Sequence, residues 1–445
     1  MDVTELSPAA RNRVGRGKRL HNRGRWWVLA LIAVVIAGNY YAWDSIAPVA
    51  DLLRHQRGFS QSQIGLLNAI YAVPNIPLSL VGGILIDRIG AARASLIAAA
   101  FGFVGTVLTA VGQPYELMVT GRLLFGIGEE TLFISLLAGV AQWFASGGAA
   151  LAMALFFSMA RVGSYSADIS PRWAVPVYAA GWQPPLALAA VLTGISLVAA
   201  VIYLRIDRYR AAVEGEPAPG AGHGRFDWRD LTRFDRSFWY IMALNVLFAS
   251  VFFPFRSTFA IVFFQDAKKL SLADAGLVNS WVFFTAIFAT PVFGLIADRF
   301  GRRAMLLTIG AALMPMTFAI LGLTHWSLWI STALMGASFS VIPAVIWPST
   351  AMLVEPRRIG TAFGLINVLQ SLGMGALNLA AGSLNDQAHA GPHNPGGYAP
   401  MLWMFGLFSF AGFLAVAALW LRESGPNGHG LNAPAPRVSS PPSEA

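Results

Sequence analysis

Two short stretches decide how this chain is interpreted: GGILIDRIGAAR at 82–93 and GLIADRFGRR at 294–303. Each closes an apolar run of helical length with glycine, aspartate, arginine and glycine in the same order. The matching positions are Gly83, Asp87, Arg88 and Gly90 in the first copy, and Gly294, Asp298, Arg299 and Gly301 in the second. The offset is 211 residues, and the pairs Gly126 and Gly336, and Gly163 and Gly373, repeat at nearly the same offset. A fixed offset predicts a duplicated unit.

The composition places this repeat in a membrane. The chain has 445 residues, of which 56% are hydrophobic and 12% charged, whereas soluble domains average about 25% charged. A bilayer core needs about 20 apolar helical residues per crossing. We therefore predict an all-α integral membrane protein with twelve transmembrane helices in two six-helix halves. The predicted spans are 26–50, 63–86, 94–112, 116–141, 149–171, 184–204, 238–264, 274–296, 304–323, 326–352, 358–382 and 399–421.

The placement of basic residues predicts the topology, because Lys and Arg are retained on the cytoplasmic side. With the N-terminus inside, the cytoplasmic segments hold 23 Lys and Arg and the outer loops hold 5. Both termini are then cytoplasmic. The net charge of +9 is explained by this asymmetry and by contacts with lipid headgroups, so no nucleic-acid partner is expected.

The spans divide the chain into five parts. These are a basic cytoplasmic tail at 1–25, an N-terminal half at 26–204, a cytoplasmic linker at 205–237, a C-terminal half at 238–421 and a disordered tail at 422–445. The first span lacks a small-residue cleavage site, so we expect it to stay in the protein. Cysteine is absent, which excludes disulfides and thiolate metal sites.

The repeated loop, with Arg122 in GRLLFGIG, resembles the major facilitator superfamily. The segments LNAIYAVPN (67–75), SMARVGS (158–164) and WPSTAMLVEPRRIGTAFG (347–364) are similar to the branch that includes the vertebrate lysosomal dipeptide uniporter. Few lysines and many arginines and alanines favour a bacterial member in the plasma membrane. The resemblance implies that Asp87 and Asp298 latch neighbouring helices during gating. The predicted gating residues are Gly83, Asp87, Arg88, Arg122, Gly294, Asp298, Arg299, Arg302 and Arg303.

Two charged residues near the middle of their spans are the leading candidates for a binding site. Charge at the bilayer centre is costly and normally faces a wet cavity or a partner. The guanidinium of Arg161 matches a carboxylate, and the carboxylate of Glu130 suits an ammonium, so the two suit the two ends of a dipeptide. The resemblance implies the same roles. The alternative is a structural ion pair between Glu130 and Arg161, and Glu129 is either paired elsewhere or protonated.

Further candidates surround these two residues. Asp44, in the outer part of span 1, is either a proton-coupled site or the partner of Arg256 in span 7. The side chains of Tyr40, Tyr71, Asn75 and Trp347 offer aromatic and hydrogen-bonding surfaces to a peptide, although each alone is more typical of helix packing. The residues Asn245, Asn279, Asn367 and Gln370 line a cavity or join helices.

These patterns predict a monomeric transporter that moves a small solute by alternating access. The leading cargo is a dipeptide, and the alternatives are a proton-coupled symporter of organic or sugar acids and a non-transporting receptor. No phosphate-binding loop or catalytic motif occurs in the sequence, so we expect no enzyme activity, no cofactor and no metal.

Overall fold

The computed structural model describes residues 8–145, 147–214, 233–324, 326–355, 358–426 and 428–432. These residues form helices joined by turns, and no strand occurs among them. We call α1 to α10 the N-terminal half and α11 to α17 the C-terminal half. The first comprises α1 (Pro8–Asp44), η2 (Ala47–Val49), α2 (Ala50–Arg57), α3 (Gln61–Ala69), α4 (Ala72–Ile89), α5 (Ala91–Val111), α6 (Tyr115–Trp143), α7 (Ala149–Asp168), α8 (Ser170–Trp173), α9 (Val175–Ala179) and α10 (Gln183–Glu214). The second comprises α11 (Arg236–Pro254), the π-helical turn η4 (Phe255–Phe259), α12 (Ala260–Lys268), α13 (Leu272–Phe300), α14 (Arg303–Leu323), α15 (Leu328–Leu353), α16 (Ile359–Gln387), η6 (Pro395–Tyr398) and α17 (Ala399–Glu423).

Ten stretches of the described residues are helical, long and apolar enough to cross a bilayer, and they coincide with ten of the predicted spans. The other two predicted spans, 63–86 and 149–171, fall on α3–α4 and on α7. The number twelve therefore stays a prediction. The centre of the predicted linker, 215–232, and the end of the predicted C-terminal tail, 433–445, lie outside the described residues. Within that tail, the His429 backbone amide donates to Glu423, and Leu431 accepts from the Arg303 amide.

The glycines that repeat in the sequence perform matching packing roles in the two halves. A Cβ on Gly126 of α6 would meet the Tyr71 backbone, and one on Gly336 of α15 would meet the Val282 carbonyl of α13. In the same way, Gly163 of α7 lies directly against the backbone of α1, and Gly373 of α16 lies against Ser250 of α11. Close backbone approach at small residues is typical of membrane helices. The repeated glycines thus mark equivalent helix crossings in both halves.

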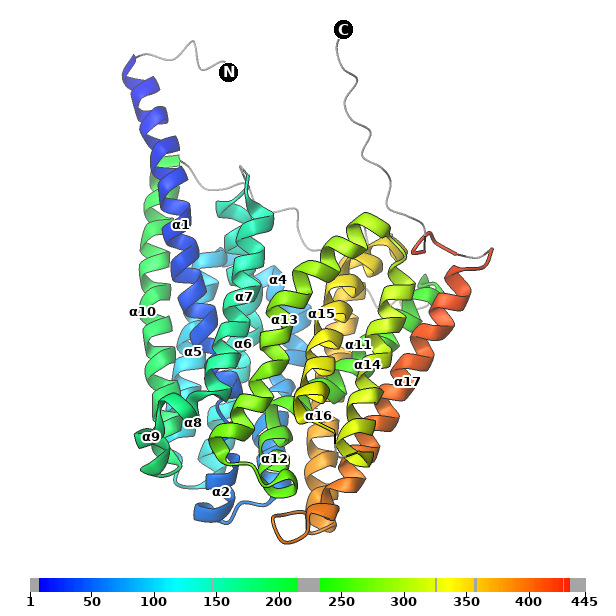
Figure 1. Ribbon diagram of the computed structural model, residues 1–445. Helices are drawn as coiled ribbons and strands as arrows, with labels where there is room; N and C mark the ends of the chain where they lie inside the picture. Colours follow the sequence, from blue (N-terminus) through cyan, green and yellow to red (C-terminus); the bar gives the residue numbers. More distant parts are fainter. Residues whose placement is uncertain are drawn as a thin grey trace.

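The helices give the bundle two distinct ends. The start of α1 and the end of α17 lie at one end, which we call the terminal side, and α2 and α12 lie at the other, which we call the distal side (Figure 1). Toward the terminal side, α1 and α17 lean apart (Figure 1). The halves meet through α3 and α4 against α16, and through α7 and α8 against α13.

Polar contacts hold the two halves together on the distal side. The Asp386 carboxylate of α16 accepts from the backbone amides of Gln61 and Ser62 at 2.8 Å each, and so caps the first turn of α3 from the other half. A carboxylate is favourable there because the first amides of a helix lack internal partners. Arg54 of α2 donates to Asp266 of α12 at 2.8 Å. The distal side is thus closed by charged and capped contacts.

Candidate functional site

A cavity of about 190 Å³ lies between the two halves, and we call it the interhalf cavity. Four of the predicted site residues line it: Tyr40, Asp44, Arg161 and Trp347. The polar side chains of Asn245 and Gln370 also line it, hydrogen-bonded to each other at 2.8 Å. Its remaining walls are mostly aromatic: Trp43, Phe133, Phe157, Phe248, Phe253, Phe283 and Phe339. Apolar walls with a few placed polar groups are typical of small-molecule sites.

Arg161 presents its charge to this cavity. Its guanidinium carbon lies 4.5 Å from the centre of the Phe339 ring, in the opposite half. Within the described residues, no carboxylate pairs with it and no hydrogen bond satisfies its five donors. A cation–π contact offsets part of the free energy of desolvation, but it leaves the N–H donors of the guanidinium without acceptors among these residues. The arrangement can accept a carboxylate or another oxyanion in a bidentate manner.

The two glutamates of α6 lie beside the cavity wall rather than in it. Neither Glu129 nor Glu130 lines the interhalf cavity, but Tyr40, which does, lies within electrostatic reach of both glutamates and of Arg161. The considered ion pair between Glu130 and Arg161 is not formed in the described structure. Glu129 is buried and accepts a long hydrogen bond of 3.4 Å from Asn75.

Tyr71 and Asn75 are predicted cargo ligands that also lie outside the cavity wall. The buried Tyr71 ring packs against Trp43, with 4.2 Å between ring centres. Tyr71 therefore supports a wall residue, and Asn75 supports Glu129. The role of Tyr71 and Asn75 in binding cargo stays a prediction.

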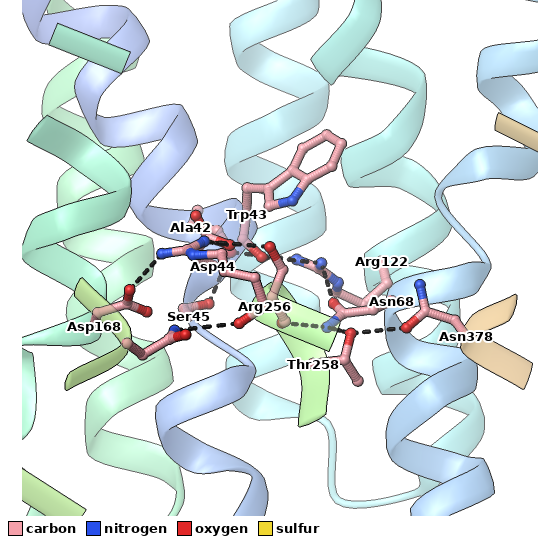
Figure 2. A network of polar contacts seen from close by, with 12 residues as sticks. Ala42, Trp43, Asp44, Ser45, Asn68, Arg122, Asp168, Arg256, Thr258 and Asn378 are labelled. Atoms are coloured by element: carbon pink, nitrogen blue, oxygen red, sulfur yellow. Dashed lines mark hydrogen bonds and ion pairs between the residues drawn. The ribbon is translucent and has the colours of Figure 1, made fainter. Parts of the chain in front are cut away.

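Asp44, Arg256 and Asp168 form a second charged group, which we call the Arg256 cluster (Figure 2). The guanidinium of Arg256, in η4, lies 2.5 Å from a carboxylate oxygen of Asp44 at the end of α1 and 2.5 Å from one of Asp168 at the end of α7. The side chains are 0%, 2% and 0% exposed for Arg256, Asp44 and Asp168, respectively. Buried charges persist only when paired. Of the two alternatives considered for Asp44, the pair with Arg256 is thus present, and it joins the two halves.

The π-helical turn η4 brings Arg256 to this position. It follows Pro254, which ends α11, and a π turn shifts the register of the side chains that follow it. The Arg256 backbone carbonyl accepts from Asn279 of α13 at 3.2 Å, and the guanidinium stacks 4.0 Å from the Phe283 ring. The turn is therefore held by the helix that also lines the cavity.

Arg122, which was predicted to act in gating, lies in a neighbouring buried network. It donates to the backbone carbonyl of Leu67 at 3.0 Å and to the Asn68 side chain at 2.7 Å. Asn68 donates in turn to Thr258 of η4 at 2.9 Å, and Thr258 donates to Asn378 of α16 at 2.8 Å. Figure 2 shows this network and the Arg256 cluster meeting at η4. Arg122 is therefore connected to the contacts that join the halves.

The repeated loop residues lie on the terminal side, where the structure describes only part of them. At Gly83, Asp87 and Asp298 the structure describes the helical backbone only, and the side chains of the two aspartates lie outside the described part. Arg88, Arg299 and Arg302 are exposed, and a Cβ added at Gly294 would meet no described atom within 4 Å. Arg303 contacts Met352 of α15. The predicted latch thus stays a prediction.

Comparison with known proteins identifies the family. The Major Facilitator Superfamily model matches residues 32–266 and 242–442. The chain belongs to the major facilitator superfamily.

Similar members of this superfamily are transporters. The lysosomal dipeptide transporter MFSD1 of Danio rerio is 28% identical over 378 residues, which cover 82% of each chain. The Homo sapiens protein of the same name is 28% identical over 81% of this chain and 80% of its own length. The "Probable sulfoacetate transporter SauU" of Cupriavidus necator is 23% identical over 77% of this chain and 83% of its own. The crystal structure of a mutant of the nucleoside transporter NupG shares the fold, with a TM-score of 0.72 at 13% identity over 88% of this chain and 99% of that chain.

The superfamily match confirms the predicted resemblance and a multi-pass membrane protein. The sequence interpretation missed Asp168 as a site residue. It is an ionisable residue near the end of a predicted span, a recognised sign of a buried partner. Asp168 lies at a depth in its span comparable to that of Asp44 and Arg256 in theirs. This shared depth could have indicated that the three side chains meet.

Proposed function

We propose that this superfamily member transports small zwitterionic peptides by alternating access between its two halves, and that dipeptides are its main cargo. The observation that carries the proposal is Arg161, a guanidinium in the wall of the interhalf cavity with no counterion among the described residues. A site that leaves a cation unpaired has lower free energy when a cargo carboxylate fills it. The dipeptide transporters among its relatives support the same cargo.

The cargo ammonium is proposed to bind an acidic residue of the N-terminal half. Glu130 is the candidate that the sequence favours, and in this structure it lies one layer behind the wall, close to Tyr40. Asp44 is the carboxylate that lines the cavity itself.

The proposed orientation places the terminal side in the cytoplasm, because the exposed arginines of the repeated loop, Arg88, Arg299 and Arg302, lie there. The described state is then closed toward the outside. We further propose that the chain acts as a monomer in a plasma membrane, with protons as a candidate coupling ion.

A second cargo class is a small organic anion. Arg161 alone suffices for a single carboxylate or sulfonate, and one of the relatives is named as a sulfoacetate transporter. In that case the glutamates beside Tyr40 serve to exchange protons instead of binding an amine.

Thermal stabilisation of purified protein separates these classes, because a ligand that binds only the folded state raises its stability. The panel comprises dipeptides, the same dipeptides with blocked termini, free amino acids and small organic acids. Stabilisation by free dipeptides that disappears in Arg161→Ala, but persists in the exposed-arginine control Arg172→Ala, supports peptide cargo. Stabilisation by acids alone favours the second class. Counterflow in proteoliposomes then tests transport, since a receptor binds without flux.

A further inference from the structure

Asp44 belongs to two sites at once. It lines the interhalf cavity together with Arg161, and it lies 2.5 Å from Arg256 in the cluster that joins the halves. Asp168 touches the same guanidinium at the same distance, but it is fully buried and does not line the cavity. The two carboxylates therefore differ in one respect, which is access to the cavity.

The charges of the Arg256 cluster are unequal. One guanidinium faces two carboxylates, so the ionised cluster carries one excess negative charge. In the described residues, the other nearby charges are Arg161, which lines the same cavity, Glu129 and Glu130 beside Tyr40, and Arg122, whose donors are occupied by backbone carbonyls and Asn68. Because only Asp44 reaches the cavity, the excess negative charge is available to a cation there.

We propose that Asp44 binds the ammonium of the peptide and that this weakens its pair with Arg256, so that filling the cavity loosens the distal closure. This inference rests on the peptide cargo proposed above. A carboxylate shared between two cations holds each less tightly than it holds one alone. Arg256 keeps Asp168, so the closure is loosened without leaving a buried charge unpaired. A ligand shifts a conformational equilibrium only by its differential affinity, and here that difference comes from Asp44.

The first test compares an alanine dipeptide with its N-acetylated form by calorimetry on the purified protein. We expect wild-type protein to bind the free peptide roughly tenfold or more tightly than the acetylated one, as for a charged hydrogen bond. Asp44→Asn removes this preference, whereas the matched control Asp168→Asn keeps it. Loss of the preference in Glu130→Gln with full retention in Asp44→Asn overturns the inference. Absence of binding of either peptide to the wild type instead overturns the proposed function itself.

The second test measures the closure directly and uses the absence of cysteine from the chain. Ala69 is buried in α3, and its carbonyl lies against Gly375 of the other half. In Ala69→Cys, the free dipeptide should accelerate thiol labelling several-fold, and the acetylated peptide should not. Adding Asp44→Asn should abolish this acceleration, and adding Asp168→Asn should preserve it even if basal labelling rises. Equal acceleration by both peptides overturns the inference.

A second cavity lies on the lipid-facing surface of the C-terminal half. A cavity of about 270 Å³ lies between α14 and α17 at the distal end, lined almost wholly by apolar side chains. Several of these are exposed, including Leu323, Trp403 and Leu407. In a membrane-spanning protein such a surface faces lipid. Along α17 the lining runs from Ala399 to Phe410, roughly 16 Å at about 1.5 Å per residue.

The cavity has one cation, the ammonium of Lys268 at the distal end of α12. Lys268 donates to the Leu321 carbonyl at 3.2 Å and pairs with no carboxylate in the described part of the chain. We propose that an anionic phospholipid of the distal leaflet inserts an acyl chain into this cavity and places its phosphate on Lys268. An ammonium above an apolar groove matches these two parts of the lipid.

The test adds phosphatidylglycerol, diacylglycerol or glycerol phosphate to delipidated protein and records bound lipid by native mass spectrometry. Phosphatidylglycerol should be retained several-fold better by wild type and by the neighbouring control Lys269→Ala than by Lys268→Ala. Equal retention by all three proteins, or equal retention of diacylglycerol by the wild type, overturns the lipid site. Binding of glycerol phosphate alone identifies a free phosphate ligand and also contradicts it.

Discussion

Arg161 and Arg256 are both arginines of the membrane domain, but Arg256 is fully buried and Arg161 only partly, and their surroundings are opposite. Arg256 has a carboxylate on each side at 2.5 Å, whereas Arg161 has an aromatic ring and the cavity. Arg161 also shares α7 with Asp168, two helical turns away, so one face of one helix serves both regions. The paired arginine joins the halves of the protein, and the unpaired one is available to a ligand.

The difference follows from desolvation. A buried ion without a partner costs several kcal/mol or more, and a protein tolerates that cost where a cavity admits water or cargo. Removing the paired arginine should therefore damage the fold, and removing the unpaired one should damage only binding.

Substitution of the paired arginine should have the largest effect. Arg256→Gln leaves Asp44 and Asp168 buried without a cation, and we expect a loss of about 3–5 kcal/mol in unfolding free energy. The measurement is equilibrium denaturation in detergent. The triple variant with Asp44→Asn and Asp168→Asn should recover much of that loss, because no uncompensated charge remains. Unchanged stability of the single variant would contradict the pairing.

Substitution of the unpaired arginine should affect ligand binding and leave the fold intact. Arg161→Ala should weaken cargo binding by about tenfold to a hundredfold, the value of a charged hydrogen bond or two. Its unfolding free energy should stay within about 1 kcal/mol of wild type, since no ion pair is lost. Calorimetry and denaturation on the same preparation measure both. A large loss of stability would show that Arg161 has a structural partner.

The contact between α13 and α7 allows a steric test beside the Arg256 cluster. A Cβ on Gly276 would overlap the Asp168 carbonyl, so Gly276→Ala should push the halves apart on the distal side. We expect a cost of about 1–3 kcal/mol from overpacking and faster labelling of Ala69→Cys. An unchanged labelling rate would mean that this crossing does not set the closure.

A partly exposed ion pair provides the reference with the smallest effect. Asp235 caps α11 through the Ser237 amide and pairs with Arg422 at 2.8 Å. Partial burial acts to raise the pKa of Asp235, but the amide hydrogen bonds and Arg422 outweigh it, so the pKa lies below its ordinary value. Asp235→Ala should cost about 1 kcal/mol, mostly from the lost cap.

The lowered pKa of Asp235 also gives the sign of a pH effect. A carboxylate with a depressed folded-state pKa contributes stability above its ordinary pKa, and that contribution fades as the pH falls through the lowered value. The difference in unfolding free energy between wild type and Asp235→Ala should therefore shrink on acidification. A difference that grows at low pH would contradict the pairing.

Much of the architecture could be predicted from local patterns. The membrane location and ten of the spans could be predicted because the length of an apolar run is a property of each segment separately. The repeated glycines were readable because they recur at a fixed offset, and they prove to mark equivalent crossings. The candidate cavity was predicted in part: Tyr40, Asp44, Arg161 and Trp347 line it, whereas Glu130, Tyr71 and Asn75 do not.

The amino-acid sequence alone was enough to infer that this protein crosses a membrane with two related sets of helices, and which charges those helices carry. Which charge meets which became visible only in the packed helices. Arg256 finds Asp168 across 88 residues of sequence, while Arg161 on the same helix as Asp168 finds no carboxylate in the described chain. The physical reason is that helix length and apolarity are local, whereas the pairing of buried charges depends on the rotation and crossing of distant helices, which packing alone sets.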